Sequence, residues 1–352
     1  MPSDWQLFQK HAQHISAIFA LSLNLLLIHL VHNKSPSSLG VYKHLINFTA
    51  VFEIVFAILD IVIQPIFYSY GSTFVIAVNV VDSFLSYAIL KWLLAIYCGF
   101  FGSLLANFSI QFVYRYWIIS GSKWIESFNG WRILGWVLLP MFSGLIWGFA
   151  AYFPGAPRPA SNEYLRQSFR DEFNLTVEGN LYVAPYFYEI RANGTVEIYL
   201  PSFMAVVINS MIISISIFTA FYYGFKCYHT LHTFNEVLPT SSQSYRNLQN
   251  QLFYSLVTQT LIPVFLMHIP VFVMFVCTFL EVNVGPLSGI VTITIALFPA
   301  IDPLPTLFII KSYRLAIQTY ISLFFHKIGS FFASRTSEGT GGTVMPSNVR
   351  TF

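Results

Sequence analysis

Four charged side chains lie within long apolar stretches of this 352-residue chain, at Glu53, Asp60, Lys91 and Asp302. A charged group is costly in an apolar environment, so each is expected to face the interior of a bundle and to have a polar partner there. Glu53 and Asp60 are seven residues apart, which places them on nearly the same face of a helix.

Prolines make two of the apolar stretches candidate hinges. Pro263 and Pro270 are seven residues apart, and each removes a backbone donor and kinks a helix. A kinked helix can swing one end with little repacking at the other, as a hinge needs, although prolines are also common in membrane helices. Asp302 is followed directly by Pro303, and a carboxylate beside helix breakers is the stronger candidate for an activation hinge.

Arg115 ends another apolar stretch and lies between Tyr114 and Tyr116. Two roles fit this position. The cation can reach across the mouth of a helix bundle and respond to a partner protein, or it can be an ordinary anchor at the membrane surface within a belt of tyrosines.

The sequence predicts neither an enzyme nor a metal site. It contains no nucleotide-binding loop, no catalytic-triad spacing and no metalloprotease helix, so no cofactor is expected. Histidines pair three residues apart, but no carboxylate or cysteine cluster completes a ligand set. These pairs are His11/His14, His29/His32 and His229/His232. The net charge of +3 is too small to indicate nucleic acid.

Seven apolar segments must position these residues. A helix needs roughly 20 apolar residues to cross a bilayer, and the composition agrees, with 55% hydrophobic and only 9% charged residues. The predicted fold is an all-α membrane protein, a bundle of seven transmembrane helices. The predicted spans are residues 12–32, 44–67, 84–114, 133–153, 200–225, 252–280 and 286–310.

Lys and Arg in the connectors set the orientation. If the N-terminus is outside, about twice as many lie on the inner side as on the outer side, which the positive-inside rule favours. The connector 154–199 then lies outside, and it carries two glycosylation sequons, at Asn174 and Asn193. Charge and sequons together predict an outer N-terminus and an inner C-terminus.

This orientation places Asp60 and Lys91 in the outer thirds of two neighbouring antiparallel helices. We therefore predict that the two side chains approach each other across that interface. The pair can be a polar anchor below a ligand pocket or a structural contact that fixes helix packing.

Three further segments carry local predictions. The apolar stretch 73–81 is too short to span, so it lies at the outer surface or extends a helix. In the outer connector, 181–183 and 195–199 can pair as a hairpin. Residues 311–327 have the pattern of a short amphipathic helix along the inner membrane surface. The seven-transmembrane domain is then 1–328, and the Gly- and Ser-rich tail 329–352 is predicted to be disordered.

The chain resembles the nematode serpentine chemoreceptors of the Str class, a seven-helix, odorant-receptor-like family. Matching stretches are spread over the whole transmembrane part and are specific only when taken together. They are residues 34–43 in the first inner loop, 52–60 with 65 and 70–74 around the second helix, Tyr114-Arg115-Tyr116 at the arginine motif of G-protein-coupled receptors, Ile262-Pro263 with Ile269-Pro270 in the sixth helix, and 298–306 followed by 311–314 after the seventh.

The resemblance implies a receptor for an odorant or another small lipophilic molecule, in the plasma membrane of chemosensory cilia. Its partners would be membrane lipid and a heterotrimeric G protein, which meets Arg115 and the residues around Lys226 and Arg246. The ligand is expected between the outer halves of the third, fifth, sixth and seventh helices, in an apolar and aromatic pocket. Tyr114 replaces the usual acid before the arginine, and Thr306 replaces the seventh-helix tyrosine of rhodopsin-like receptors.

Two other classes of protein compete with this interpretation. A ligand-gated channel of the inverted seven-helix kind would have its N-terminus inside, with both sequons in the cytoplasm. A transporter should show internal repeats and helices broken at matching positions, and no such repeat is present in the sequence.

Overall fold

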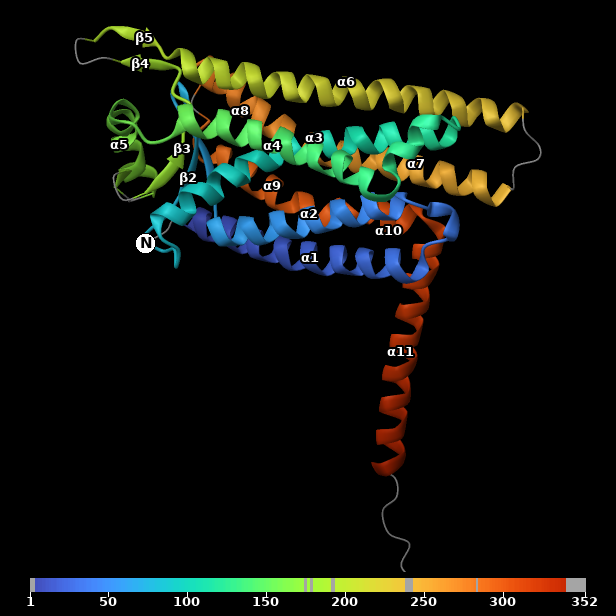
Figure 1. Cartoon of the computed structure of the whole chain (residues 1–352). Coiled ribbons are helices and arrows are strands. Elements are labelled where there is room, and N and C mark those ends of the chain that lie inside the picture. The colour runs from blue at the N-terminus through green and yellow to red at the C-terminus, as the bar shows by residue number, and fades with distance from the viewer. Residues whose placement is uncertain are drawn as a thin grey trace, which may run out of the picture.

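The computed structural model describes residues 4–173, 176–177, 180–190, 194–237, 243–282 and 284–339. Within these residues, seven helical segments are long and apolar enough to cross a membrane. They lie side by side along one axis, with the strands and the N-terminus at one end, here called the outer end (Figure 1). The predicted seven-helix fold is confirmed.

The first five spans are single helices: α1 (Asp4–Lys34), α2 (Tyr42–Ile63), α3 (Tyr87–Ile119), α4 (Ile133–Gly155) and α6 (Leu200–Val237). The sixth span comprises α7 (Gln243–Pro263), a π-helical turn (Val264–His268) and α8 (Ile269–Phe279). The seventh comprises α9 (Gly289–Ile301) and α10 (Pro303–Ile309). Several helices extend beyond the predicted spans because backbone hydrogen bonding continues past the apolar window that hydropathy detects.

Two small sheets cover the outer end of the bundle. Strands β1 (Ile66–Tyr70), β2 (Thr73–Val78) and β3 (Leu181–Val183) form one antiparallel sheet, and β4 (Tyr188–Ile190) pairs with β5 (Val196–Ile198) in the other. The segment from Thr73 is therefore an outer strand and not an extension of a helix. The predicted pairing of 181–183 with 195–199 is wrong. The buried β3 adds to the sheet over the bundle, whereas the exposed β5 pairs outside it.

Helix α5 (Pro159–Phe173) packs on the first sheet through Leu165 and Phe169. Tyr182 of β3 donates to Oδ1 of Asn162 at 2.6 Å and lies 2.8 Å from the Ser161 hydroxyl. Burial raises the pKa of Tyr182 to about 12, so this hydroxyl stays protonated and can donate. The outer end is thus closed by a folded cap.

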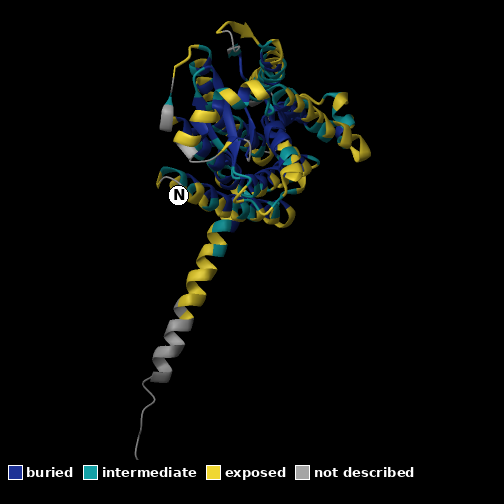
Figure 2. Cartoon of the chain, turned by 90° about the vertical axis from the view of Figure 1, so that its left-hand side faces the viewer, coloured by how far each residue is buried: buried dark blue, intermediate teal, exposed yellow. Residues whose placement is uncertain are grey.

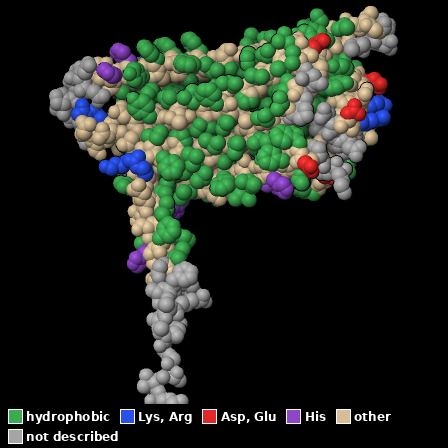
Figure 3. Space-filling view, turned by 180° about the vertical axis from the view of Figure 1, so that it is seen from behind, with side chains coloured by type: hydrophobic (Ala, Val, Ile, Leu, Met, Phe, Trp, Pro, Cys, Tyr) green, Lys and Arg blue, Asp and Glu red, His purple; other side chains and the backbone are tan. Residues whose placement is uncertain are grey.

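The distribution of side chains matches a bundle surrounded by lipid. Buried residues fill the centre and exposed residues face outward (Figure 2). The flank of the bundle is mostly hydrophobic, while charged side chains gather toward its two ends (Figure 3). Large apolar side chains such as Phe218 and Phe221 are more than two-thirds exposed, at 71% and 75%. Such a surface is stable only against lipid or another apolar partner.

Helices α3 and α4 approach closely because α4 has glycine at both 144 and 148. A Cβ on Gly148 would lie 2.5 Å from the backbone oxygen of Ala95, and one on Gly144 would lie 2.8 Å from that of Gly99. Small residues four apart allow such contact between membrane helices.

Helix α11 (Lys311–Gly339) leaves the inner end of the bundle at a steep angle to the spans, the direction expected of a helix lying along a membrane surface (Figure 1). Its start is fixed by Tyr313, whose hydroxyl lies 2.7 Å from that of Ser35. Burial raises the pKa of Tyr313 to about 12. The helix extends past the predicted boundary at 328 to Gly339, and residues 340–352 lie outside the described residues.

Candidate ligand pocket and coupling face

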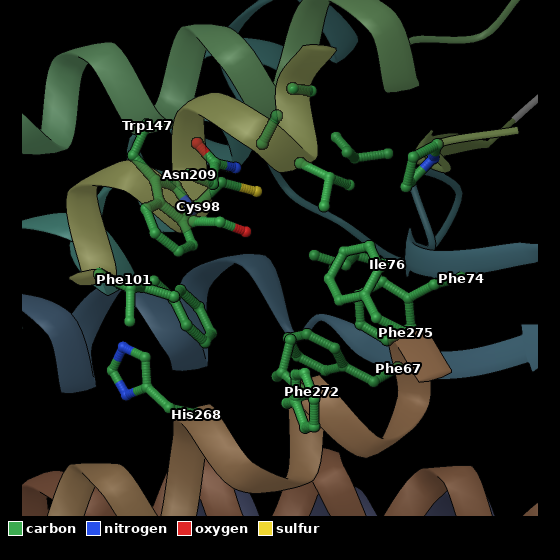
Figure 4. Close-up of a pocket in the computed structure, with 18 of the residues that line it drawn as sticks. Phe67, Phe74, Ile76, Cys98, Phe101, Trp147, Asn209, His268, Phe272 and Phe275 are labelled. Carbon is green, nitrogen blue, oxygen red and sulfur yellow. The ribbon is translucent and has the colours of Figure 1, made fainter. Parts of the chain in front are cut away.

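A cavity of about 260 Å³ lies in the outer half of the bundle (Figure 4). Helices α3, α4, α6 and α8 form its sides, and strands β1 to β3 close it on the outer side. Its lining is largely aromatic and aliphatic, as predicted. The aromatic members are Phe67, Phe74, Phe101, Trp147, Phe272, Phe275 and Phe279.

The helices that form the pocket differ in part from the predicted set. The third, fifth and sixth spans contribute, and the fourth contributes Trp147 and Ala151, whereas the lining found within the described residues includes none from the seventh. The reason is the β1–β2 hairpin. The backbone N–H of Phe67 donates to Oγ1 of Thr292 at 3.0 Å, so β1 covers α9 and separates it from the cavity.

The π-helical turn brings a histidine to the pocket. It lies between Pro263 and Pro270, the two prolines that predicted a hinge, and π turns often mark functional sites. Nδ1 of His268 lies 3.1 Å from the Pro263 carbonyl oxygen, and its ring makes an edge contact with Phe101. His268 lines the cavity, which the sequence analysis did not anticipate.

Below the pocket, Asp302 joins the sixth and seventh spans. Nε2 of Gln259 donates to Oδ2 of Asp302 at 3.0 Å and to its backbone oxygen at 3.1 Å. Thr306 donates to Oε1 of Gln259 at 2.8 Å. Glu53 interacts with Asp302 from the second span, and the two residues are only 1% and 0% exposed. The structure thus brings together two of the four intramembrane charges in a polar centre.

The predicted contact between Asp60 and Lys91 is wrong. Asp60 accepts a hydrogen bond of 3.0 Å from the hydroxyl of Tyr97. Lys91 instead lies over the rings of Trp92 and Tyr152, at 5.3 and 5.8 Å from their centroids. Lys91 precedes Tyr97 by six residues, about 240° around a helix, so the two side chains leave α3 on different faces. Asp60 therefore has a neutral partner.

Arg115 is buried near the inner end of the bundle, with only 2% of its surface exposed. Its guanidinium carbon lies 3.6 Å from the centroid of the Tyr42 ring, and Nη1 donates to Oε1 of Gln249 at 2.9 Å. Tyr42 in turn donates to Gln111 at 3.0 Å. Arg115 thus ties the third span to the second and the sixth. It lies beneath the inner surface, and the sequence analysis missed both Tyr42 and Gln249.

The other residues of the predicted coupling face make contacts of their own. Tyr114 is buried and stacks on Tyr42, with ring centroids 5.5 Å apart. Lys226 lies over the rings of Tyr116 and Tyr222, at 5.4 and 4.4 Å. Arg246, near the start of α7, donates to Gln243 at 2.9 Å. Asn174 and Asn193 lie outside the described residues.

Comparison with known proteins decides the family. The profile described as "Serpentine type 7TM GPCR chemoreceptor Str" matches residues 9–318. The chain belongs to this family. G-protein coupled receptor str-217 of Caenorhabditis elegans is 35% identical over 315 residues, covering 90% of each chain. Serpentine receptor class r-10 of the same organism is 27% identical, covering 90% of this chain and 92% of that one.

A solved structure supports the fold independently. The crystal structure of squid rhodopsin superposes with a TM-score of 0.61 at 12% identity, covering 92% of this chain and 87% of that one. Similarity at this identity concerns the architecture alone. Together with the seven spans, the family assignment makes this Str-family chain a multi-pass membrane protein of a receptor family.

Proposed function

We propose that this Str-family receptor is activated by an odorant or another small lipophilic molecule that reaches the outer pocket from the extracellular side. It then signals through a heterotrimeric G protein at its inner end. The observation that carries the proposal is the apolar cavity of about 260 Å³, which is lined in part by the π turn of the sixth span. The proposed location is the plasma membrane of chemosensory cilia.

The sixth span connects the two ends of the molecule. Its outer part, α8, lines the pocket, and its inner part, α7, carries Gln249, which binds Arg115. A ligand that changes the packing around the π turn biases the angle between α7 and α8, because Pro263 and Pro270 weaken the backbone ladder there. Asp302 and Pro303 allow a matching adjustment in the seventh span.

Outward movement of α7 separates Gln249 from Arg115 and opens a cleft at the inner end. Nε and Nη2 of Arg115 have no hydrogen-bond partner among the described residues, so the guanidinium has unused donors for a G-protein segment. Tyr114, Tyr116, Lys226 and Arg246 would surround this cleft. The closed arrangement described above then corresponds to the resting receptor.

The inverted channel is not favoured, because the chain belongs to a family of G-protein-coupled receptors. Orientation can still be tested directly. Glycosidase sensitivity should be lost in the Asn174→Gln, Asn193→Gln double variant, and a C-terminal tag should be labelled only in permeabilised cells. Labelling of the tag on intact cells would refute the proposed orientation.

The proposed activity is tested by expressing the receptor with a G-protein dissociation reporter and applying a panel of volatile molecules. An Ala205→Phe variant places an aromatic ring at the wall of the cavity, so it should abolish responses while surface expression is retained. Ala88→Phe, at an exposed position near the start of α3, is the control. Equal responses of the Ala205→Phe variant and the wild type would show that this cavity is not the ligand site.

A further inference from the structure

Two polar atoms at the deep side of the pocket have no hydrogen-bond partner among the described residues. They are Nε2 of His268 and Oδ1 of Asn209, and both atoms are buried. Both residues line the cavity. A buried polar atom left without a partner costs free energy. A ligand that supplies the missing partner recovers this free energy, so the two atoms indicate what the ligand must offer.

The position of these atoms follows from the direction of the helices. The sixth span runs outward, and His268 is the innermost of its residues in the lining, which extends to Phe279. The fifth span runs inward, and Asn209 lies one turn deeper than Ala205 and one turn less deep than Ile213, which also lines the cavity. In Figure 4, Asn209 and His268 appear with Trp147 and Phe101, whereas the phenylalanines of the strands and of α8 gather elsewhere around the cavity. The inner part of the pocket, here called its floor, therefore contains two polar side chains among apolar ones, whereas the outer part is apolar.

The contact with Pro263 favours one tautomer of His268. Because a carbonyl oxygen only accepts, donation to it at 3.1 Å places the proton of this tautomer on Nδ1. In the neutral imidazole, Nε2 is then an acceptor. Oδ1 of Asn209 is an acceptor as well. The floor of the pocket thus presents two acceptors that need donors.

We propose that the ligand of this pocket carries a hydrogen-bond donor, an aliphatic alcohol or a phenol, whose hydroxyl is directed to the His268–Asn209 floor and whose apolar body fills the aromatic part. A hydroxyl donates one hydrogen bond and so pairs with one of the two acceptors, whereas ketones, esters and ethers of the same shape offer only acceptors and leave both without a partner. This inference rests on the proposed function to the extent that the cavity is the ligand site.

The volume limits the size of such a molecule. The cavity of about 260 Å³ is slightly smaller than the roughly 300–1,000 Å³ typical of pockets for drug-sized ligands. A ligand of about eight to ten non-hydrogen atoms fits this space. The acceptor on His268 is also joined through Nδ1 to Pro263, so a hydroxyl bound there contacts the residue that shapes the π turn.

The test uses pairs of compounds that match in size and differ in donor capacity. The full-length receptor is purified in lipid nanodiscs, and stabilisation against thermal unfolding is measured with 2-octanol against 2-octanone and with 4-ethylphenol against 4-methylanisole. Each pair has the same number of non-hydrogen atoms. We expect the alcohol and the phenol to reach half-maximal stabilisation at concentrations at least about tenfold lower than the ketone and the ether. The reason is that the ketone and the ether leave both buried acceptors unpaired.

Two variants test the assignment from different helices. His268→Asn retains an amide donor close to the position of Nδ1 and removes the Nε2 acceptor, and Asn209→Leu keeps the side-chain shape and removes Oδ1. The variant that removes the acceptor of the ligand hydroxyl should weaken binding of the alcohol and the phenol by about tenfold, while binding of the ketone and the ether changes little. Phe265→Leu, in the same π turn but 60% exposed and outside the lining, is the matched control.

Several results would overturn the proposal. One is that the ketone and the ether stabilise the receptor as strongly as the alcohol and the phenol, or more strongly. Another is that none of the four compounds stabilises it. A third is that both variants keep the preference for the alcohol and the phenol unchanged. Failure of the proposed function looks different, since the compounds would then bind with the expected preference but release no G protein. Equal activation of the G protein by 2-octanol and 2-octanone would instead refute the requirement for a donor and leave the proposed function intact.

Discussion

Arg115 and Gln249 are joined by a hydrogen bond of 2.9 Å that links the third and sixth spans near the inner end of the bundle. Both side chains are buried, so the bond is shielded from water. A hydrogen bond to a charged group contributes about 1.5–3 kcal/mol. If this bond holds the resting conformation, its loss should alter the balance between resting and active receptor.

We predict that Gln249→Leu raises ligand-free signalling. Loss of about 1.5 kcal/mol from the resting state alone shifts the equilibrium roughly tenfold toward the open form. The measurement is G-protein dissociation per receptor at the cell surface without added ligand. Asn247→Ala, two residues away and exposed, is the control. Basal signalling equal to that of the wild type would show that the bond does not set the resting state.

Substitutions of Tyr42 should separate its two contacts. Tyr42→Phe keeps the ring that lies 3.6 Å from the guanidinium and removes only the hydroxyl that donates to Gln111. Tyr42→Leu removes both, including a cation–π contact that contributes about 2 kcal/mol when desolvated. The midpoint temperature of thermal unfolding of the purified receptor should therefore fall further for Tyr42→Leu than for Tyr42→Phe. The reverse order would contradict a cation–π role.

The polar centre beneath the pocket predicts that two substitutions of Asp302 differ in their effect on stability. Asp302→Asn retains a side-chain oxygen that can accept from Gln259, whereas Asp302→Leu leaves the buried Gln259 donor without its side-chain acceptor. We expect Asp302→Leu to destabilise the receptor by about 1–3 kcal/mol more than Asp302→Asn. Thermal unfolding of the two purified variants in detergent measures the difference. Equal stability of the two variants would rule out this account of Gln259.

Packing between α3 and α4 gives a test that is independent of function. Gly148→Ala places a Cβ against the backbone of Ala95, where neither helix can give way without a shift, and overpacking of this kind costs about 1–3 kcal/mol. Gly135→Ala, on the same helix with open space around the added atom, should be neutral or slightly stabilising. Surface expression and the midpoint temperature of thermal unfolding are measured for both variants. A neutral Gly148→Ala would show that the two helices can separate without penalty.

The sequence by itself determined the number of spans, the family and the positions of the prolines, since hydropathy over about 20 residues and local motifs are independent of tertiary contacts. It also determined that Glu53, Asp60 and Asp302 must be buried, because charges in lipid need a protein interior. Their partners did not follow from it.

Only the tertiary structure decided which residues meet. Asp60 and Lys91 have the right depth to pair, but the rotation of α3 directs Tyr97 to Asp60 and Lys91 to Tyr152. No sequence pattern marks Gln249 or Tyr42 as a partner of Arg115, yet both contact it. His268 reaches the pocket through a π turn whose extra residue shifts the face of the helix. Composition indicates how deep in the membrane a residue lies. The direction in which its side chain leaves the helix depends on how that helix packs against its neighbours.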